Sequence, residues 1–198
     1  MKNILYILIA LMSFSCKAQV VPLNTYYDDA STGAYFKDTF DEMNKFVGTW
    51  KFTSGNTTLT ITLEKKENVF DGEFYEDLLI GEYKYVKNGI ELINTLPVLN
   101  DPSITGRYHN ISGRQIIPNN IFVLCNDCTQ NERRFKLHFN DPQRDYLSVS
   151  IILRYLLNES NPNKMTVTVF ANDGVMLPYN GAPTEPRVPY GEYLMIKQ

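Results

Sequence analysis

From residue 48 onward the sequence alternates between apolar and polar side chains with a period of two. In the first clear run, Leu59, Ile61 and Leu63 alternate with threonines and a glutamate. Strict alternation is typical of a half-buried antiparallel strand, because successive side chains of a strand point to opposite faces of the sheet. The pattern recurs over residues 135–140, 147–157 and 164–171. We therefore predict about eight to ten strands.

The breaks between these runs carry turn residues. Asn88-Gly89, between two apolar-alternating segments, is a strong signal for a two-residue hairpin. The chain lacks a long helical segment between the strands, which excludes β-α-β units. An antiparallel meander removes its exposed edges by closing on itself. The predicted fold is therefore all-β: an antiparallel meander that closes into a barrel.

Two segments depart from the alternation. Apolar residues recur at helical spacing over residues 34–46, which predicts one short helix before the barrel. Residues 177–190 contain four prolines and cannot form a central strand. They predict a long loop, either a passive crossover or a lid or binding loop, before a last strand over residues 192–197.

The N-terminus has the features of an export signal. Lys2 precedes an apolar run of about nine residues, which is too short to span a bilayer but suits a secretory signal peptide. The sequence Ser13-Phe14-Ser15-Cys16 resembles a bacterial lipobox, in which the cysteine is lipidated and becomes the mature N-terminus. Ordinary cleavage after Ala18 is the alternative. The predicted domains are a signal peptide over 1–15, a tether over 16–33 and a barrel over 34–198.

These features predict an extracytoplasmic location. By the sorting rules of the lipoproteins that this N-terminus resembles, the Lys-Ala-Gln after Cys16 implies the outer membrane and its periplasmic leaflet. Cleavage after Ala18 would instead release the chain into the periplasm. The expected partner is a membrane, through the lipid at Cys16. The net charge of −3 and the absence of any basic run argue against a nucleic-acid partner, and no pattern indicates an oligomeric state.

The only tryptophan, Trp50, follows Gly48 at the start of the first strand. A short helix, a Gly-x-Trp motif and an all-β meander resemble the lipocalin and fatty-acid-binding-protein superfamily. The resemblance implies that Trp50 closes one end of a lipocalin-like barrel and that a cation, Lys197 or Arg154, stacks on its ring. Gly48 would allow a close approach of the turn. The chain also resembles the uncharacterised small envelope lipoproteins of Bacteroidota.

Cys125 and Cys128 form a close pair between two predicted strands. The pair can form a structural disulfide, act in redox chemistry or supply half of a metal site. Zinc sites usually need a second pair or nearby histidines, and redox pairs need a helix N-terminus. In an oxidising compartment a disulfide is favoured.

Other candidate residues point to no catalytic chemistry. The acidic set of Glu73, Glu76, Asp77 and Glu82 fits a solvated face better than a catalytic carboxylate pair. No nucleophile motif or phosphate-binding glycine loop occurs. We therefore predict a protein that is not an enzyme, with no catalytic, cofactor or metal-binding residues.

The tyrosines offer one candidate binding feature. They either line the mouth of a ligand site or are ordinary strand residues at a water boundary; the candidates are Tyr83, Tyr85, Tyr108, Tyr179 and Tyr190. Small barrels of about eight strands either are filled by side chains or hold one ligand. The first hypothesis is an envelope lipoprotein that binds or carries a small apolar ligand inside the barrel. The alternative is a filled barrel that acts as a protein–protein interaction or scaffold module.

Overall fold

The computed structural model describes residues 18–118, 121–173 and 179–198. The predicted signal peptide and Cys16 lie outside these residues, as do Leu177 and Pro178 of the predicted loop. In the described part of the chain, no helix has the length and apolarity needed to cross a membrane.

The structure is built from eleven described strands and four short 3-10 turns. The strands are β1 (Val20–Pro22), β2 (Tyr35–Lys37), β3 (Gly48–Ser54), β4 (Thr57–Phe70), β5 (Tyr75–Lys87), β6 (Ile90–Asn94), β7 (Ile111–Ile117), β8 (Arg134–Phe139), β9 (Val149–Ser160), β10 (Asn163–Ala171) and β11 (Gly191–Lys197). The turns are η1 (Tyr27–Asp29), η2 (Asn44–Phe46), η3 (Leu96–Asn100) and η4 (Gly106–Tyr108).

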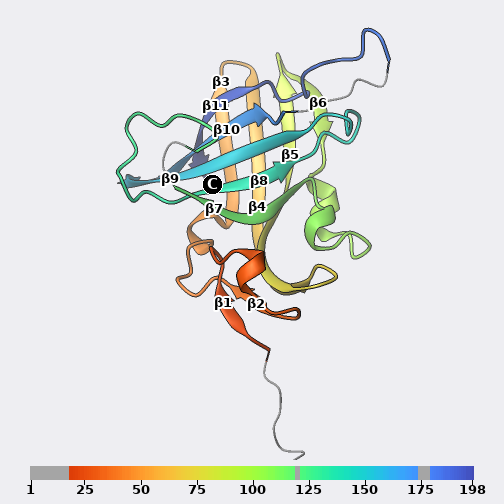
Figure 1. The fold of residues 1–198 in the computed structure, drawn as a ribbon. Helices are drawn as coiled ribbons and strands as arrows, with labels where there is room; N and C mark the ends of the chain where they lie inside the picture. The colour runs from red at the N-terminus through yellow and green to blue at the C-terminus, as the bar shows by residue number, and fades with distance from the viewer. Residues whose placement is uncertain (1–17, 119–120, 174–178) are drawn as a thin grey trace, which may run out of the picture.

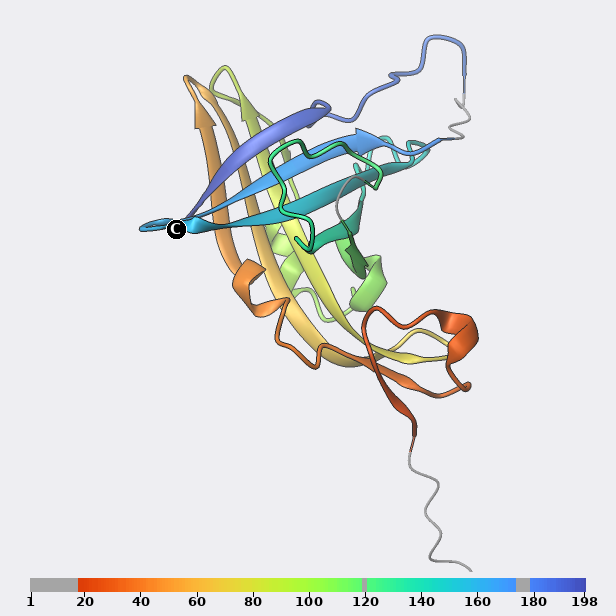
Figure 2. The same ribbon diagram turned by 60° about the vertical axis from the view of Figure 1, so that its left-hand side comes forward.

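Eight of the strands close into an antiparallel barrel (Figures 1 and 2). The order around the wall is β3-β4-β5-β7-β8-β9-β10-β11, and β11 pairs with β3 to complete the circle. β6 extends the far end of β5 through the predicted hairpin, in which Asn88 and Gly89 both have positive φ. The all-β barrel prediction is confirmed, and the eight-stranded wall fits a lipocalin-like architecture.

The predicted helix over residues 34–46 is not present. This segment forms β2 and then the 3-10 turn η2. A continuous helix cannot pass through Asp41, because its φ of 53° lies in the left-handed region. Phe36, Met43 and Phe46 are nevertheless buried, while Phe40 remains 73% exposed. The apolar spacing of Phe36, Phe40, Met43 and Val47 correctly indicated the burial of Phe36 and Met43 and the partial burial of Val47. It did not indicate the exposure of Phe40 or the backbone that buries the others.

The chain joins the fold earlier than the predicted tether allows. The backbone N–H of Tyr35 donates to the Gln19 carbonyl (2.7 Å), and β1 pairs in parallel with β2. Val21 and Leu23 are buried against the core. β2 in turn pairs in parallel with the first residues of β5. Residues 19–33 are therefore part of the folded unit, at the lower end of the barrel in Figure 1.

The lumen is filled by the inward-facing side chains of the barrel strands. They belong to one continuous buried cluster that runs from Trp50 at one end to Tyr83 and Val188 toward the other. The members on the strands alternate with outward residues, as the period-two pattern predicts; they include Leu59, Ile61, Leu63, Leu79, Ile111, Phe135, Leu137, Phe139, Val149, Ile151, Leu153, Met165, Val167, Val169 and Met195.

The barrel closes at a short seam between β5 and β7. Only three pairs join these strands, from Leu79↔Gly113 to Gly81↔Ile111. Gly81 is required here because a Cβ would lie 2.6 Å from the Thr62 carbonyl oxygen on β4. The short ladder implies that other contacts must help to hold β7 against β5.

Two buried glutamates on β5 supply these contacts. Glu76 accepts hydrogen bonds from the guanidinium groups of Arg107 and Arg114, the latter at 2.7 Å from Nε. Glu82 accepts from the side chain of Asn110 (2.7 Å) and contacts His109 Nδ1 (3.0 Å). Each glutamate thus ties β5 to β7 or to the segment just before it.

The predicted solvated acidic face is therefore wrong for three of its four members. Glu76, Asp77 and Glu82 are fully buried, and only Glu73 is exposed. The carboxylate of Asp77 accepts hydrogen bonds from the Tyr35 hydroxyl and the Asp38 backbone N–H. Buried carboxylates need such partners, because an unpaired buried charge is costly.

The proline-rich segment is docked on the opposite end of the barrel. Val188 is fully buried, and the Tyr146 hydroxyl donates to the Pro183 carbonyl (2.9 Å). Arg187 forms an ion pair with buried Asp141 and also donates to the Leu92 carbonyl (3.1 Å). The described part of the segment, residues 179–190, is therefore attached to the barrel and does not have the form of a free lid.

We predict that Glu76→Gln destabilises the barrel by roughly 3–5 kcal/mol, because it leaves the buried guanidinium of Arg114 without its counter-charge. The measurement is urea unfolding followed by circular dichroism. Glu64→Gln is the matched control, since the Glu64–Lys66 pair is exposed and contributes about 0–1 kcal/mol. Equal losses for both variants would contradict the role of Glu76 at the seam.

We also predict a pH-dependent effect of Arg187→Gln. Burial by itself would raise the pKa of Asp141, but the hydrogen bonds and charge of Arg187 outweigh burial and lower it. Because the folded pKa is lowered, Asp141 stabilises the folded protein at pH values above the unfolded pKa of about 3.9. This stabilisation is lost as the pH falls through the folded pKa.

The variant should therefore lose roughly 3–5 kcal/mol near neutral pH, and its difference from wild type should shrink below about pH 4. Unfolding curves measured across this range test the prediction. A difference that stays constant down to the lowest accessible pH would show that the ion pair is not its source.

Candidate functional site

Trp50 closes one end of the lumen and contacts Lys197. The two residues are register partners on β3 and β11, and Lys197 Nζ lies 5.3 Å from the centroid of the indole ring. The indole N–H donates to the Phe46 carbonyl (2.7 Å). Gly48 has a φ of +120°, and a Cβ there would lie 3.1 Å from Lys197 Cε. Gly48 thus leaves room for the lysine that covers the tryptophan.

Arg154, the other candidate cation for Trp50, is used elsewhere. Its guanidinium donates to Glu132 and to Asp127 (2.8 Å to Oδ2) in the loop between β7 and β8. The same loop contains Cys125 and Cys128, which are joined by a disulfide. These contacts hold the loop against the outside of β9. The disulfide thus lies in a surface loop that is attached to the barrel wall.

The tyrosines considered as a ligand mouth do not form one. The Tyr83 side chain is buried in the core, and its hydroxyl donates to the Asn140 carbonyl (2.9 Å). Tyr85 is also buried, whereas Tyr179 and Tyr108 project into solvent. Tyr190 is partly buried against the core. The structure spreads these residues over the core, the surface and the upper end of the molecule.

A first cavity, of about 480 Å³, lies between the lower part of β4 and residues 99–109. His109 lines it, and the contact with Glu82 orients its ring. Among the described residues, no hydroxyl or thiol bonds to His109. Glu82 and His109 therefore form a structural pair at the seam.

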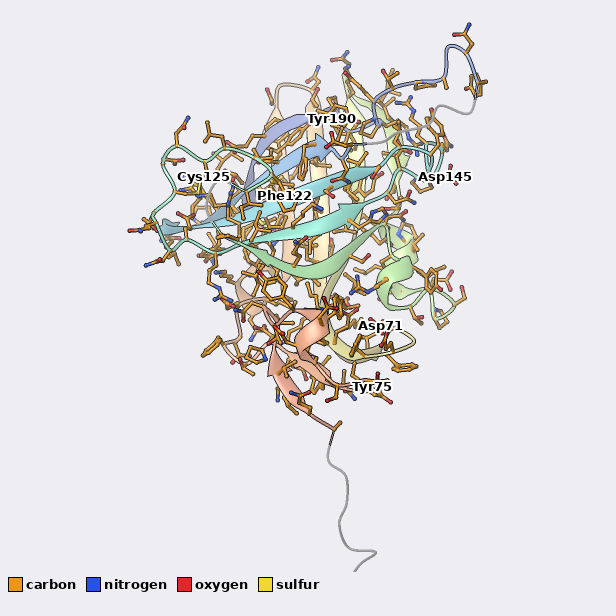
Figure 3. All side chains as sticks on the ribbon, viewed as in Figure 1. Asp71, Tyr75, Phe122, Cys125, Asp145 and Tyr190 are labelled. Carbon is orange, nitrogen blue, oxygen red and sulfur yellow. A yellow bond between two sulfur atoms is a disulfide. The ribbon has the colours of Figure 1, made fainter. Side chains whose placement is uncertain are left out.

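A larger cavity, of about 720 Å³, is a groove on the outer wall of β7, β8 and β9. We call it the outer groove. Residues 23–27 border it at one end, and Ile121 and Phe122 from the β7–β8 loop border it on the side. Outward-facing residues of the strands make its floor: Ser112, Gln115, Lys136, His138 and Ser150. Figure 3 shows Phe122 over this wall, in the same loop as Cys125.

The outer groove is cationic. Arg107, Arg114 and Lys136 line it, and no carboxylate does so among the described residues. Glu76 pairs with both arginines and offsets one of their charges. Lys136 has no ion pair within the described part of the chain. In a protein of net charge −3, this groove concentrates positive charge at one place.

Lys136 and Phe122 form the centre of the groove. Lys136 Nζ lies 4.6 Å from the centroid of the Phe122 ring. Burial lowers the pKa of Lys136, and burial together with the charge of Lys136 lowers the pKa of His138. Lys136 is thus a partly desolvated cation with no counter-charge among the described residues, and the lowered pKa of His138 favours its neutral form.

Phe122 also has a strained backbone. Its φ of 66° lies in the left-handed region, which is unusual for a bulky residue and costs of order 1–3 kcal/mol. The ring is nevertheless 54% exposed, so burial of the ring does not account for the strain. The backbone holds an aromatic ring over a lysine that has no ion pair with any described residue.

Sequence reasoning did not identify this groove. Lys136 and His138 were visible only as the polar positions of an alternating strand. Their proximity to Arg107 and Arg114 depends on the β7–β8 pairing and on a register shift between Ser112 and Gln115. Neither can be read from a single sequence.

The whole chain, residues 1–198, matches the model of a family described as Family of unknown function (DUF6705). The chain belongs to this family. No curated protein and no solved structure matches it. The family description assigns no activity, so a functional proposal must come from the geometry.

We predict that Lys197→Met destabilises the protein by about 0.5–2 kcal/mol, because Trp50 loses its cation–π partner. Since Trp50 is the only tryptophan, its emission spectrum should change as well. Lys51→Met, on the exposed face of β3, is the control and should change neither property. Identical behaviour of the two variants would contradict a specific contact between Lys197 and Trp50.

Proposed function

We propose that this protein is an extracytoplasmic lipoprotein that binds a small amphipathic anion in the outer groove. The observation that carries the proposal is a cationic groove with an aromatic wall and no lining carboxylate among the described residues. The proposed role is binding, not catalysis.

The packing of the barrel favours a ligand site on the outer wall over one in the lumen. The notion of an apolar ligand inside the barrel requires free space between the inward side chains. These side chains are large and fully buried, with Trp50, Phe135 and Phe139 among them. Protein interiors are packed at a density that leaves little room for a ligand. Both cavities described above open beside loops on the outside of the wall.

The chemistry of the groove selects the ligand class. An acidic group placed near Lys136 would supply the counter-charge that the described residues do not provide, and His138 lies two residues further along the same strand. An apolar or aromatic body would then contact Phe122 and Ile121 on one side. Specific sites combine apolar walls with a few fixed polar groups in this way.

The proposed anchor rests on the N-terminal sequence. Lipidation of Cys16 after removal of residues 1–15 would hold the protein on the outer membrane, facing the periplasm. Cleavage after Ala18 would give a free periplasmic protein instead. The mass of the protein purified from its own envelope distinguishes the two outcomes.

The groove can be tested with two probes that differ only in charge. Anilinonaphthalene sulfonate carries a sulfonate, and N-phenylnaphthylamine has the same rings without it. We predict that the folded protein binds the sulfonate at one site and that Lys136→Gln weakens this binding about tenfold, as expected for a hydrogen bond to a charged group. Fluorescence titration measures both affinities.

Two controls make the result specific. Lys84→Gln removes a lysine on another part of the wall and should not change either affinity. Phe122→Ala should weaken both probes, because both use the aromatic wall. Equal binding of the two probes, or equal effects of Lys136→Gln and Lys84→Gln, would contradict the proposal.

A filled barrel that serves as a scaffold is the second candidate. The closely packed lumen favours it, because such a barrel needs no ligand to be stable. A folded protein that binds neither probe would support this alternative.

A further inference from the structure

The distance between the proposed anchor and the folded unit is short. The Gln19 carbonyl accepts a hydrogen bond from Tyr35, and its side-chain oxygen accepts one from the Ser31 backbone N–H (3.0 Å). Gln19 is the third residue after Cys16. An extended chain spans at most about 3.3–3.6 Å per residue, so a lipid on Cys16 would lie within roughly 10 Å of Gln19. Such a tether brings one particular end of the barrel to the membrane.

That end carries a row of apolar and aromatic side chains across four strands. Val20 on β1 pairs with Tyr35 on β2, Tyr35 pairs with Tyr75 on β5, and Tyr75 pairs with Phe70 on β4. Register partners on adjacent strands point to the same face of a sheet. We call these four residues the aromatic row. Figure 3 shows Tyr75 at the lower end, where the chain enters the fold at β1.

Three members of the aromatic row are exposed, and Tyr35 is half-buried because its hydroxyl donates to Asp77. The other face of the same strands is covered. Val20 is 57% and Phe70 is 55% exposed. The Phe70 and Tyr75 rings pack against each other, with their centroids 5.0 Å apart. On the opposite face, Phe36 is fully buried against Tyr27 and Phe74. The fold thus buries one aromatic group and leaves a second one in solvent.

We propose that the aromatic row contacts the lipid surface and orients the barrel on the membrane. The inference rests on the proposed anchor at Cys16, because the short tether is what selects a membrane as the occupant. Val20 is itself part of the row, so the chain leaves the row directly toward the proposed lipid. Aromatic side chains are favoured at the membrane–water interface.

The orientation follows from the direction of β5. This strand runs from Tyr75 in the row to Lys87 at the other end of the barrel, and Ile90 follows in β6. Thirteen residues of strand span about 40 Å. Seating the row on the membrane would place the β5–β6 hairpin far from the lipid surface. Ile90 is therefore a matched control position, because it is also exposed.

The test supplies the tether chemically, so that it does not depend on lipidation in the cell. The chain from Cys16 onward retains every described residue, and Cys125 and Cys128 are joined by a disulfide. Cys16 can then be coupled to a maleimide-headgroup lipid in phosphatidylethanolamine and phosphatidylglycerol vesicles. Phe70→Trp and Ile90→Trp each add a second tryptophan to the chain, in addition to buried Trp50. Brominated lipids quench the fluorescence of any tryptophan that contacts the bilayer.

We expect brominated lipids to remove the added emission of Phe70→Trp and to leave that of Ile90→Trp unchanged. Replacing Tyr75 with serine in the Phe70→Trp background should reduce the quenching. Equal quenching at both positions, or none at Phe70→Trp, would overturn the inference even if the cell lipidates Cys16. Conversely, a protein purified from the envelope without lipid on Cys16 would contradict the proposed anchor. The chemically coupled protein would still show whether the aromatic row contacts the bilayer.

Discussion

The closure of the barrel between β5 and β7 is the constraint on which the rest of the structure depends. Three residue pairs form this ladder, far fewer than join β4 to β5. The seam is completed by Glu76 and Glu82, whose buried carboxylates bind groups at or just before β7. Because a buried carboxylate is costly without partners, these bonds specify where β7 must lie.

The same seam explains the cationic groove. Glu76 draws the guanidinium groups of Arg107 and Arg114 to the outside of the wall, where Arg114 also stacks on the Phe36 ring at 4.1 Å. One carboxylate cannot neutralise two arginines. The residual charge lies next to Lys136, which has no ion pair within the described residues, and the proposed ligand site is thus a by-product of how the barrel is closed. The N-terminal segment helps to form it, because Arg114 donates to the Leu23 carbonyl (2.6 Å).

The sequence predicted the features that depend on local periodicity and turn chemistry. The alternation of Leu59, Ile61 and Leu63 identified both a strand and its inward face, and Asn88-Gly89 identified a hairpin. Residues 34–46 were wrongly predicted as a helix, because burial of Phe36 and Met43 fits helical spacing as well as the strand and turn that form. The acidic residues of β5 were assigned to solvent because charged residues are rarely fully buried without partners. The arginine, histidine and asparagine partners of Glu76 and Glu82 are 27 or more residues away along the chain.

The sequence by itself therefore determined the all-β class, the barrel and most of its core, since a period of two and the residues of tight turns act over a few neighbours. The tertiary structure decided the rest. It placed β1 and β2 beside β5, buried Glu76 and Glu82, filled the lumen, and brought Arg107, Arg114 and Lys136 to one groove. It also aligned Val20, Tyr35, Tyr75 and Phe70 across four strands. Each of these depends on pairing between distant segments, which side-chain packing and buried charge determine only when the whole chain has folded.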